Sequence, residues 1–162
     1  MDDFENIYRE NYSKMFGIAR KMVNDGDVAG DIVQEAFIHY FEKLQNGLVI
    51  HHPPSWLMRV TINQCADYLK QMKKRMPLSV VSETATKDET SGSTSEVILK
   101  QAIAELKPVE MKLIMLYSEG YSYKEIAQIA DINFSSVGKT LSRTLHKLKE
   151  ILKRLKYETN MY

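Results

Sequence analysis

Apolar residues recur every three or four positions in two parts of the chain, residues 1–75 and 95–157. This spacing is typical of amphipathic α-helices. Between them, residues 76–94 show no such period and are rich in Ser, Thr and acidic residues, a composition typical of flexible linkers. We therefore predict an all-α protein in which two small helical domains, residues 1–75 and 95–162, are joined by a flexible linker over residues 76–94.

Breaks in the apolar pattern divide the first part into three helices. The segment Asn24–Asp27 interrupts the first stripe, and Asp27 is a candidate N-cap for the second helix. The second helix should end near Asn46 and Gly47. Residues His51–Pro54 should form a loop, in which proline suits the opening of the third helix. In that helix we expect Trp56 to belong to the core rather than to stack on bases.

The composition narrows the class of protein. With 162 residues, 44% of them hydrophobic and 27% charged, the chain reads as a soluble globular protein. It has no apolar run of membrane-spanning length, and its acidic start does not resemble a signal peptide. A single cysteine, Cys65, excludes an intramolecular disulfide and fits a reducing compartment. We therefore expect a cytoplasmic location.

The distribution of charge is more informative than its sum. A formal net charge of +1 argues at first against nucleic-acid binding. However, residues 1–67 hold ten acidic and six basic residues, while residues 132–157 hold seven basic residues and one acidic residue. A second basic cluster consists of Lys70, Lys73, Lys74 and Arg75. Local clusters of this kind bind phosphates, although either one alone could be a solvated helix face.

The second part contains the pattern of a helix-turn-helix. Ser122 and Glu125 are spaced as a capping box at the start of a short helix. The turn Asp131–Asn133 follows, and Asn133 can cap a long helix that begins at Phe134. That helix combines one apolar stripe, which includes Leu145, with a polar and basic face. The alternative is an ordinary surface helix of a helical bundle.

The polar face of the long helix suits contact with DNA. Its Arg and Lys side chains can bond guanine edges or phosphates, and serines near its start can bond phosphates. The candidate DNA-contacting residues of this helix are Ser135, Ser136, Lys139, Thr140, Ser142, Arg143 and Lys147.

Both parts together resemble an extracytoplasmic-function (ECF) sigma factor of bacterial RNA polymerase. In that family an N-terminal domain opens the promoter and a C-terminal helix-turn-helix binds the −35 element. The segment Asp31–Phe37, sequence DIVQEAF, is similar to the family helix that docks on the clamp coiled coil of the polymerase. The resemblance implies that Asp31, Gln34 and Glu35 bind the polymerase.

A second segment, Trp56–Asn63 followed by Asp67–Lys70, resembles the family helix that binds the −10 element. Asn63 matches a position that helps to recognise an extruded base, and its amide can bond a base edge. The resemblance further implies that phosphates are contacted by Arg59, Lys70, Lys73, Lys74 and Arg75.

A third segment, Glu119–Ala127, is close to the family pattern E-G-x-S-Y-x-E-I-A. The likeness then decreases. Gly138, Lys139 and Thr140 stand where many members have Lys or Arg, Ser, and Arg, whereas Arg143 keeps the expected basic residue. We expect Gly138 to serve a close backbone approach, because glycine within a helix is otherwise unfavourable by about 0.8–1 kcal/mol.

The resemblance implies a protein that is not itself an enzyme and uses no cofactor, metal or small-molecule substrate. Its expected partners are core RNA polymerase, through the clamp coiled coil and the flap, promoter DNA, and an anti-sigma factor. Two other readings remain open. A stand-alone regulator would use residues 1–75 to sense a signal or to dimerise. An enzyme is the other, although Cys65 lacks an evident base and the four histidines are scattered over both domains.

Overall fold

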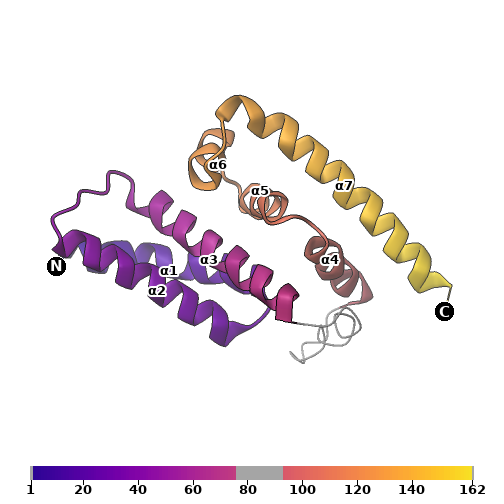
Figure 1. The fold of residues 1–162 in the computed structure, drawn as a ribbon, viewed down its shortest axis with the longest axis horizontal. Coiled ribbons are helices and arrows are strands. Elements are labelled where there is room, and N and C mark those ends of the chain that lie inside the picture. Colours follow the sequence, from indigo (N-terminus) through magenta and orange to yellow (C-terminus); the bar gives the residue numbers. More distant parts are fainter. Residues whose placement is uncertain (1, 76–92, 162) are drawn as a thin grey trace. The chain divides into compact units, whose positions relative to one another are not determined.

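The structure, a computed structural model, describes residues 2–75 and 93–161. Within these ranges it contains seven α-helices and no strand, which confirms the predicted all-α class. Helices α1 to α3 form one compact unit (unit 1), and α4 to α7 form another (unit 2) (Figure 1). The predicted linker, residues 76–94, lies outside the described residues except for Ser93 and Thr94, where α4 begins.

Unit 1 is a bundle of three helices, α1 (Asp2–Val23), α2 (Gly26–Gln45) and α3 (Pro53–Arg75), each packed against the other two. All three helices contribute to its core. The largest side chains that are fully buried there are Met15, Ile18, Val33, Leu57, Met58 and Ile62. Each such side chain stabilises the fold by about 1.5–3 kcal/mol when it leaves water, so the core fixes which face of each helix remains exposed.

Aromatic contacts join the start of α1 to the second half of α2. The ring centroids of Tyr8 and Phe37 lie 4.7 Å apart, and those of Phe4 and Phe41 lie 5.3 Å apart. Both distances fall in the range in which aromatic pairs attract each other beyond simple burial. These contacts hold α2 in a fixed position on α1.

The start of α2 differs from the prediction. Its N-cap is Asp25, not Asp27: the Asp25 carboxylate accepts hydrogen bonds from the backbone N–H groups of Asp27 and Val28, at 2.9 and 3.2 Å. Asp25 has the extended backbone that an N-cap requires, whereas Asp27 is already helical. The third helix begins at Pro53, so both prolines expected in the loop belong to its first turn.

Unit 2 is built around one long helix. α4 (Thr94–Ala104), α5 (Pro108–Ser118) and α6 (Tyr123–Ala130) all pack against α7 (Phe134–Asn160). The largest fully buried side chains are Leu106, Leu113, Leu116, Ile126, Ile129 and Leu141. None of the helices within the described ranges is long and apolar enough to cross a membrane.

The apolar stripe of α7 follows a different line from the one predicted. Leu145 is 39% exposed, whereas Thr144 is buried. The buried positions Val137, Leu141, Thr144 and Leu148 are spaced by four, three and four residues, so Leu145 falls at the edge of the stripe. The Thr144 hydroxyl donates to the backbone carbonyl oxygen of Thr140 at 2.8 Å, which allows this polar side chain to be buried.

The helix-turn-helix has the predicted capping box. The backbone N–H of Glu125 donates to Ser122 Oγ at 3.2 Å, and the backbone N–H of Ser122 donates to Glu125 Oε2 at 2.8 Å. After α6 the chain turns at Asp131, which has a left-handed φ of 54°. Asn133 is the N-cap of α7 as predicted, but its side chain makes no capping hydrogen bond.

Candidate nucleic-acid and polymerase interface

One face of α3 presents a line of polar and basic side chains. Arg59, Asn63, Lys70 and Lys74 follow one another at intervals of four, seven and four residues, which places them on the same side of the helix. Asn63, Lys70 and Lys74 are exposed and Arg59 is half-buried. The opposite side of α3 holds buried residues such as Ile62 and belongs to the core, so this polar line faces outward.

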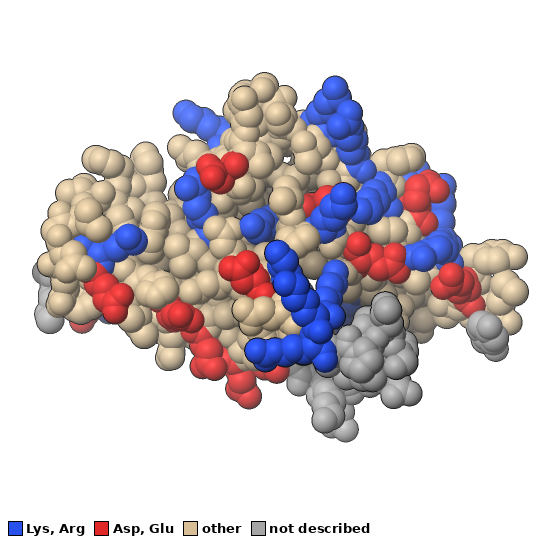
Figure 2. Space-filling model, viewed as in Figure 1, with Lys and Arg blue, Asp and Glu red and all other residues tan. Residues whose placement is uncertain are grey.

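The last turn of α3 is strongly cationic. Lys73, Lys74 and Arg75 are exposed there, and Lys70 lies one turn before them. Figure 2 shows Lys and Arg side chains gathered at this end of the helix. Cations at a helix C-terminus are stabilised by the helix dipole, and a group of them is an electrostatic site for phosphates.

The exposed face of α2 is acidic. Asp31, Gln34 and Glu35 all face solvent, while the neighbouring Val33 and Ala36 are buried. Glu35 also lies 4.0 Å from His39, one turn further along the helix. This face can therefore contact a basic partner without disturbing the core.

Sequence reasoning did not single out the apolar centre of this acidic face. Ile38 follows Gln34 by four residues and Glu35 by three, and it is 55% exposed. Its position on the outer side of α2 could have been read from the same helical period that placed the two polar residues there.

An open hollow lies where α2 meets the loop before α3. It has a volume of about 370 Å³ and is lined by His39, Glu42, Lys43, Asn46, Leu48 and Trp56. The Trp56 ring is only half-buried: it packs on Tyr40 with centroids 6.0 Å apart, and Lys43 Nζ lies 6.0 Å from its centroid. Trp56 thus lies at the edge of the core, where it lines this hollow, rather than within the core.

The start of α7 presents most of the predicted −35 residues together. Ser135, Ser136, Lys139, Ser142 and Arg143 are exposed. Thr140 is half-buried, and its carbonyl oxygen is bonded by Thr144. The first five therefore form an accessible polar surface along the outer side of α7, hereafter the reading face.

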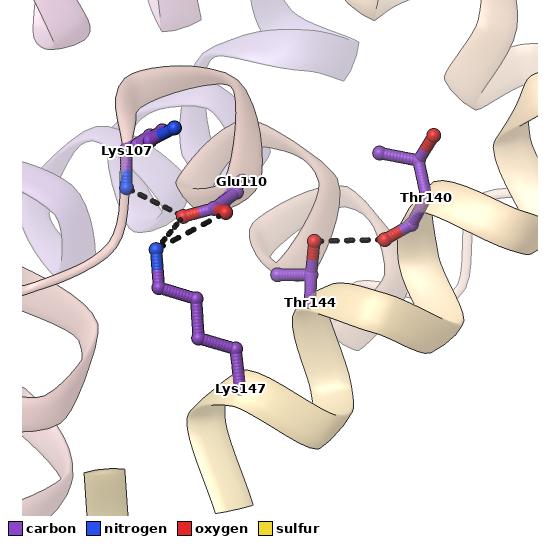
Figure 3. A network of polar contacts seen from close by, with 5 residues as sticks. All are labelled: Lys107, Glu110, Thr140, Thr144 and Lys147. Carbon is purple, nitrogen blue, oxygen red and sulfur yellow. Dashed lines mark hydrogen bonds and ion pairs between the residues drawn. The ribbon is translucent and has the colours of Figure 1, made fainter. Parts of the chain in front are cut away.

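Lys147 stands apart from the reading face. Its Nζ lies 2.9 Å from Oε2 and 3.2 Å from Oε1 of Glu110, on α5 (Figure 3). The backbone N–H of Lys107 donates to Glu110 Oε2 as well, at 2.7 Å. Burial acts to raise the pKa of Glu110, but the bonds from Lys147 and Lys107 outweigh it and hold the pKa below its ordinary value.

Gly138 lies against the first residue of α6. A Cβ at this position would be 3.4 Å from Cε2 of Tyr123. This distance corresponds to ordinary van der Waals contact with a side chain, so an alanine would fit, and the contact does not show the close backbone approach expected of Gly138.

The long helix begins at Phe134 as predicted, but the exposure of this side chain was not predicted. Phe134 is the first residue of α7, immediately before the reading-face serines, and it is 60% exposed.

Metal binding and thiol chemistry find no support among the described residues. No group of three or more His, Cys, Asp or Glu side chains within them could hold a metal ion. Cys65 is fully buried, and burial raises the pKa of its thiol to about 12. A buried thiol with so high a pKa is a poor nucleophile near neutral pH.

Two family models match the chain in order. Residues 7–75 match the model described as Sigma-70 region 2, and residues 96–148 match the model described as Sigma-70, region 4. The first contains the polar line of α3 and the acidic face of α2, and the second contains the helix-turn-helix.

Similar proteins support the same family. RNA polymerase sigma factor CarQ of Myxococcus xanthus is 24% identical over 97% of this chain and 93% of its own length. The ECF RNA polymerase sigma factor SigM of Mycobacterium tuberculosis is 21% identical over 98% of this chain and 81% of its own. The ECF RNA polymerase sigma-E factor of Escherichia coli K12 is 28% identical over 80% of this chain and 76% of its own.

A solved structure shares the fold. The sigma factor RpoE of Bartonella quintana, crystallised in complex with the anti-sigma factor NepR, matches with a TM-score of 0.64 and 22% identity. The match covers 94% of this chain and 98% of that one. With both sigma regions matched in order and relatives aligned over most of the chain, the protein belongs to the ECF group of the sigma-70 family, the RNA polymerase sigma factors that direct promoter-specific initiation of transcription.

Proposed function

We propose that residues 1–75 bind core RNA polymerase and the −10 element, that residues 95–162 bind the −35 element, and that residues 76–94 link these two domains. The observation that carries this assignment is the presence of one outward polar and basic helix face in each unit. These faces are the α3 line around Asn63 and the α7 reading face around Arg143. Each face is the reverse side of a helix whose other side is core.

In this proposal α3 binds the −10 element. The Asn63 amide can both donate to and accept from the edge of an unstacked base, and capture of such a base offsets the few kcal/mol needed to unstack it. Arg59 and Lys70 lie on either side of Asn63 along the same line. They would bind flanking phosphates, together with Lys73, Lys74 and Arg75 at the end of the helix.

The acidic face of α2 is proposed to dock on the clamp coiled coil of the polymerase. Asp31 and Glu35 supply exposed carboxylates, and Gln34 supplies an amide between them. A basic partner surface would complement this face and speed its association. We assign the contact with the polymerase flap to unit 2 as a whole.

The reading face of α7 is proposed to enter the major groove of the −35 element. Ser135 and Ser136 lie in the first turn, where hydroxyls can bond phosphates, while Lys139 and Arg143 can reach base edges. Ser142 and Thr140 flank these two cations. Lys147 is already bonded to Glu110, and we propose that it supports α7 rather than binding DNA.

The polymerase then makes two weak DNA contacts act together. When both units are held on one enzyme, the second contact forms at a raised effective concentration. We propose that the chain itself catalyses no reaction and acts in the cytoplasm. We also propose an anti-sigma factor as its regulator, by analogy with the complex of RpoE and NepR from Bartonella quintana.

An electrophoretic mobility shift with and without core polymerase tests the proposal. The DNA would be fragments selected from a randomised promoter library. We expect specific complexes only with the polymerase, and promoter-dependent transcripts from the same mixture. Specific binding of a two-fold symmetric site by the free chain would instead support a stand-alone regulator.

Two variants test the placement of residues. Asn63→Ala should impair promoter opening while leaving polymerase binding intact. Arg143→Ala should relax one −35 position by about 1–3 kcal/mol. The matched control is Lys156→Ala, which removes an exposed cation near the other end of α7 and should leave the selected sequences unchanged.

A further inference from the structure

Phe134 places a large apolar side chain where α7 begins. It is 60% exposed, although a phenylalanine gains about 1.5–3 kcal/mol when it is fully buried. The next two residues, Ser135 and Ser136, belong to the reading face, and Val137 is the first residue of α7 that enters the core. The ring of Phe134 therefore remains largely available for a contact outside the chain.

The position of Phe134 in the helix-turn-helix indicates that this contact is with DNA. The N-terminal residues of a recognition helix are those that contact base edges in the major groove. Phe134 precedes Ser135 and stands five residues before Lys139, so it lies at the end of the helix that enters the groove first. With α7 placed in the −35 groove as proposed, an aromatic ring at this position lies close to base edges.

The neighbouring positions leave this edge of α7 without a cation. Gly138 follows Phe134 by four residues and so lies on the same side of the helix. A Cβ at Gly138 would touch the Tyr123 ring, which is itself partly exposed. This edge of the helix thus presents the rings of Phe134 and Tyr123 rather than a basic side chain.

We infer that Phe134 contacts the 5-methyl group of a thymine in the −35 element and makes the protein prefer thymine at that position. The inference rests on the proposed placement of α7 in the −35 major groove. The thymine methyl is the apolar group that base pairs present in that groove, and phenylalanine is among the residues that contact it. Cytosine lacks this methyl, and purines offer polar atoms instead.

The test uses holoenzyme made from core polymerase and the full chain. Duplexes with a randomised −35 region are selected by the wild type, by Phe134→Ala and by Tyr157→Ala. Tyr157 is a matched control because it is another exposed aromatic residue, 69% exposed, near the other end of α7. We expect the wild type and Tyr157→Ala to select thymine at one position, and Phe134→Ala to lose that preference.

A second step removes only the methyl group. Deoxyuridine replaces the selected thymidine, which keeps every hydrogen-bonding group of the base. Binding by the wild type should weaken about fourfold, the value of one buried methylene-sized group. Binding by Phe134→Ala should not change. Melting temperatures of the variants equal to that of the wild type would exclude a folding defect.

Three results would overturn the inference: an unchanged thymine preference in Phe134→Ala, wild-type selection without any preferred thymine, or no effect of deoxyuridine at any thymine. Arg143→Ala separates this failure from that of the proposed function. If Arg143→Ala relaxes the selected sequence and Phe134→Ala does not, only the role of Phe134 is wrong. If neither variant changes the sequence, the placement of α7 in the groove is wrong as well.

Discussion

Lys147 on α7 and Glu110 on α5 are joined by two hydrogen bonds, although 37 residues separate them in the sequence. The Glu110 carboxylate also accepts the backbone N–H of Lys107 at the start of α5. The Glu110 side chain thus accepts a free backbone N–H at the start of α5 and also connects α5 to α7. Its removal should affect folding before it affects DNA binding.

Glu110→Gln should lower the free energy of unfolding by about 1–2 kcal/mol near neutral pH, because the charged hydrogen bonds are lost. The folded state lowers the pKa of Glu110, so its contribution is fully present above the ordinary value of 4.5. It is lost as the pH falls through the lower pKa of the folded state. Urea denaturation at neutral pH and well below pH 4.5 measures the difference. An equal deficit at both pH values would contradict this account.

Ser122→Ala should destabilise unit 2 by about 1 kcal/mol, because the Glu125 backbone N–H loses its acceptor at the start of α6. Ser122→Gly should have an effect of only a few tenths of a kcal/mol. The control is Ser142→Ala, at an exposed serine within α7, which should stay within about 0.5 kcal/mol of the wild type. Thermal unfolding followed by circular dichroism would rank the three variants.

Gly138→Ala should stabilise the protein by about 0.5–1 kcal/mol, since alanine favours a helix and the new methyl would only touch the Tyr123 ring. Gly120 offers the opposite case. Its φ of +84° is strained for any residue with a Cβ, so Gly120→Ala should destabilise the protein. Denaturant titration of both variants measures whether the free energy of unfolding rises or falls. A destabilised Gly138→Ala would show that Tyr123 cannot adjust.

Glu35→Arg should weaken binding to core polymerase by at least about tenfold, because like charges across an interface cost several kcal/mol. Glu10→Arg is the matched control, an exposed carboxylate on α1 that should leave the affinity unchanged. Fluorescence anisotropy of the labelled chain titrated with core enzyme measures both. Equal affinities for the two variants would remove α2 from the clamp interface.

Helical periodicity predicted the helices well because burial of apolar side chains is a regular function of position along a helix. It could not fix the cap of α2. Asp25 and Asp27 are both good capping residues two positions apart, and the backbone conformation of Asp25 decides between them. It also missed that Thr144 rather than Leu145 is buried, since a hydrogen bond to Thr140 makes burial of the hydroxyl acceptable.

The candidate site was predictable where it depends on one helix. The face through Arg143 follows from helical spacing, whereas the line through Asn63 was assigned through the family resemblance, and both face outward in the structure. The bond between Lys147 and Glu110 was not predictable, because it joins two helices whose packing the sequence pattern does not specify. For the same reason, Lys147 was assigned to the DNA set on its position in α7 alone.

α3 carries Leu57, Ile62 and Cys65 in the core on one side, and Arg59, Asn63, Lys70 and Lys74 on the other. The two sets share no position, so a change in the outward set leaves the buried set intact. If the outward set reads the −10 element as proposed, substitutions in it would change promoter preference while remaining nearly neutral for folding.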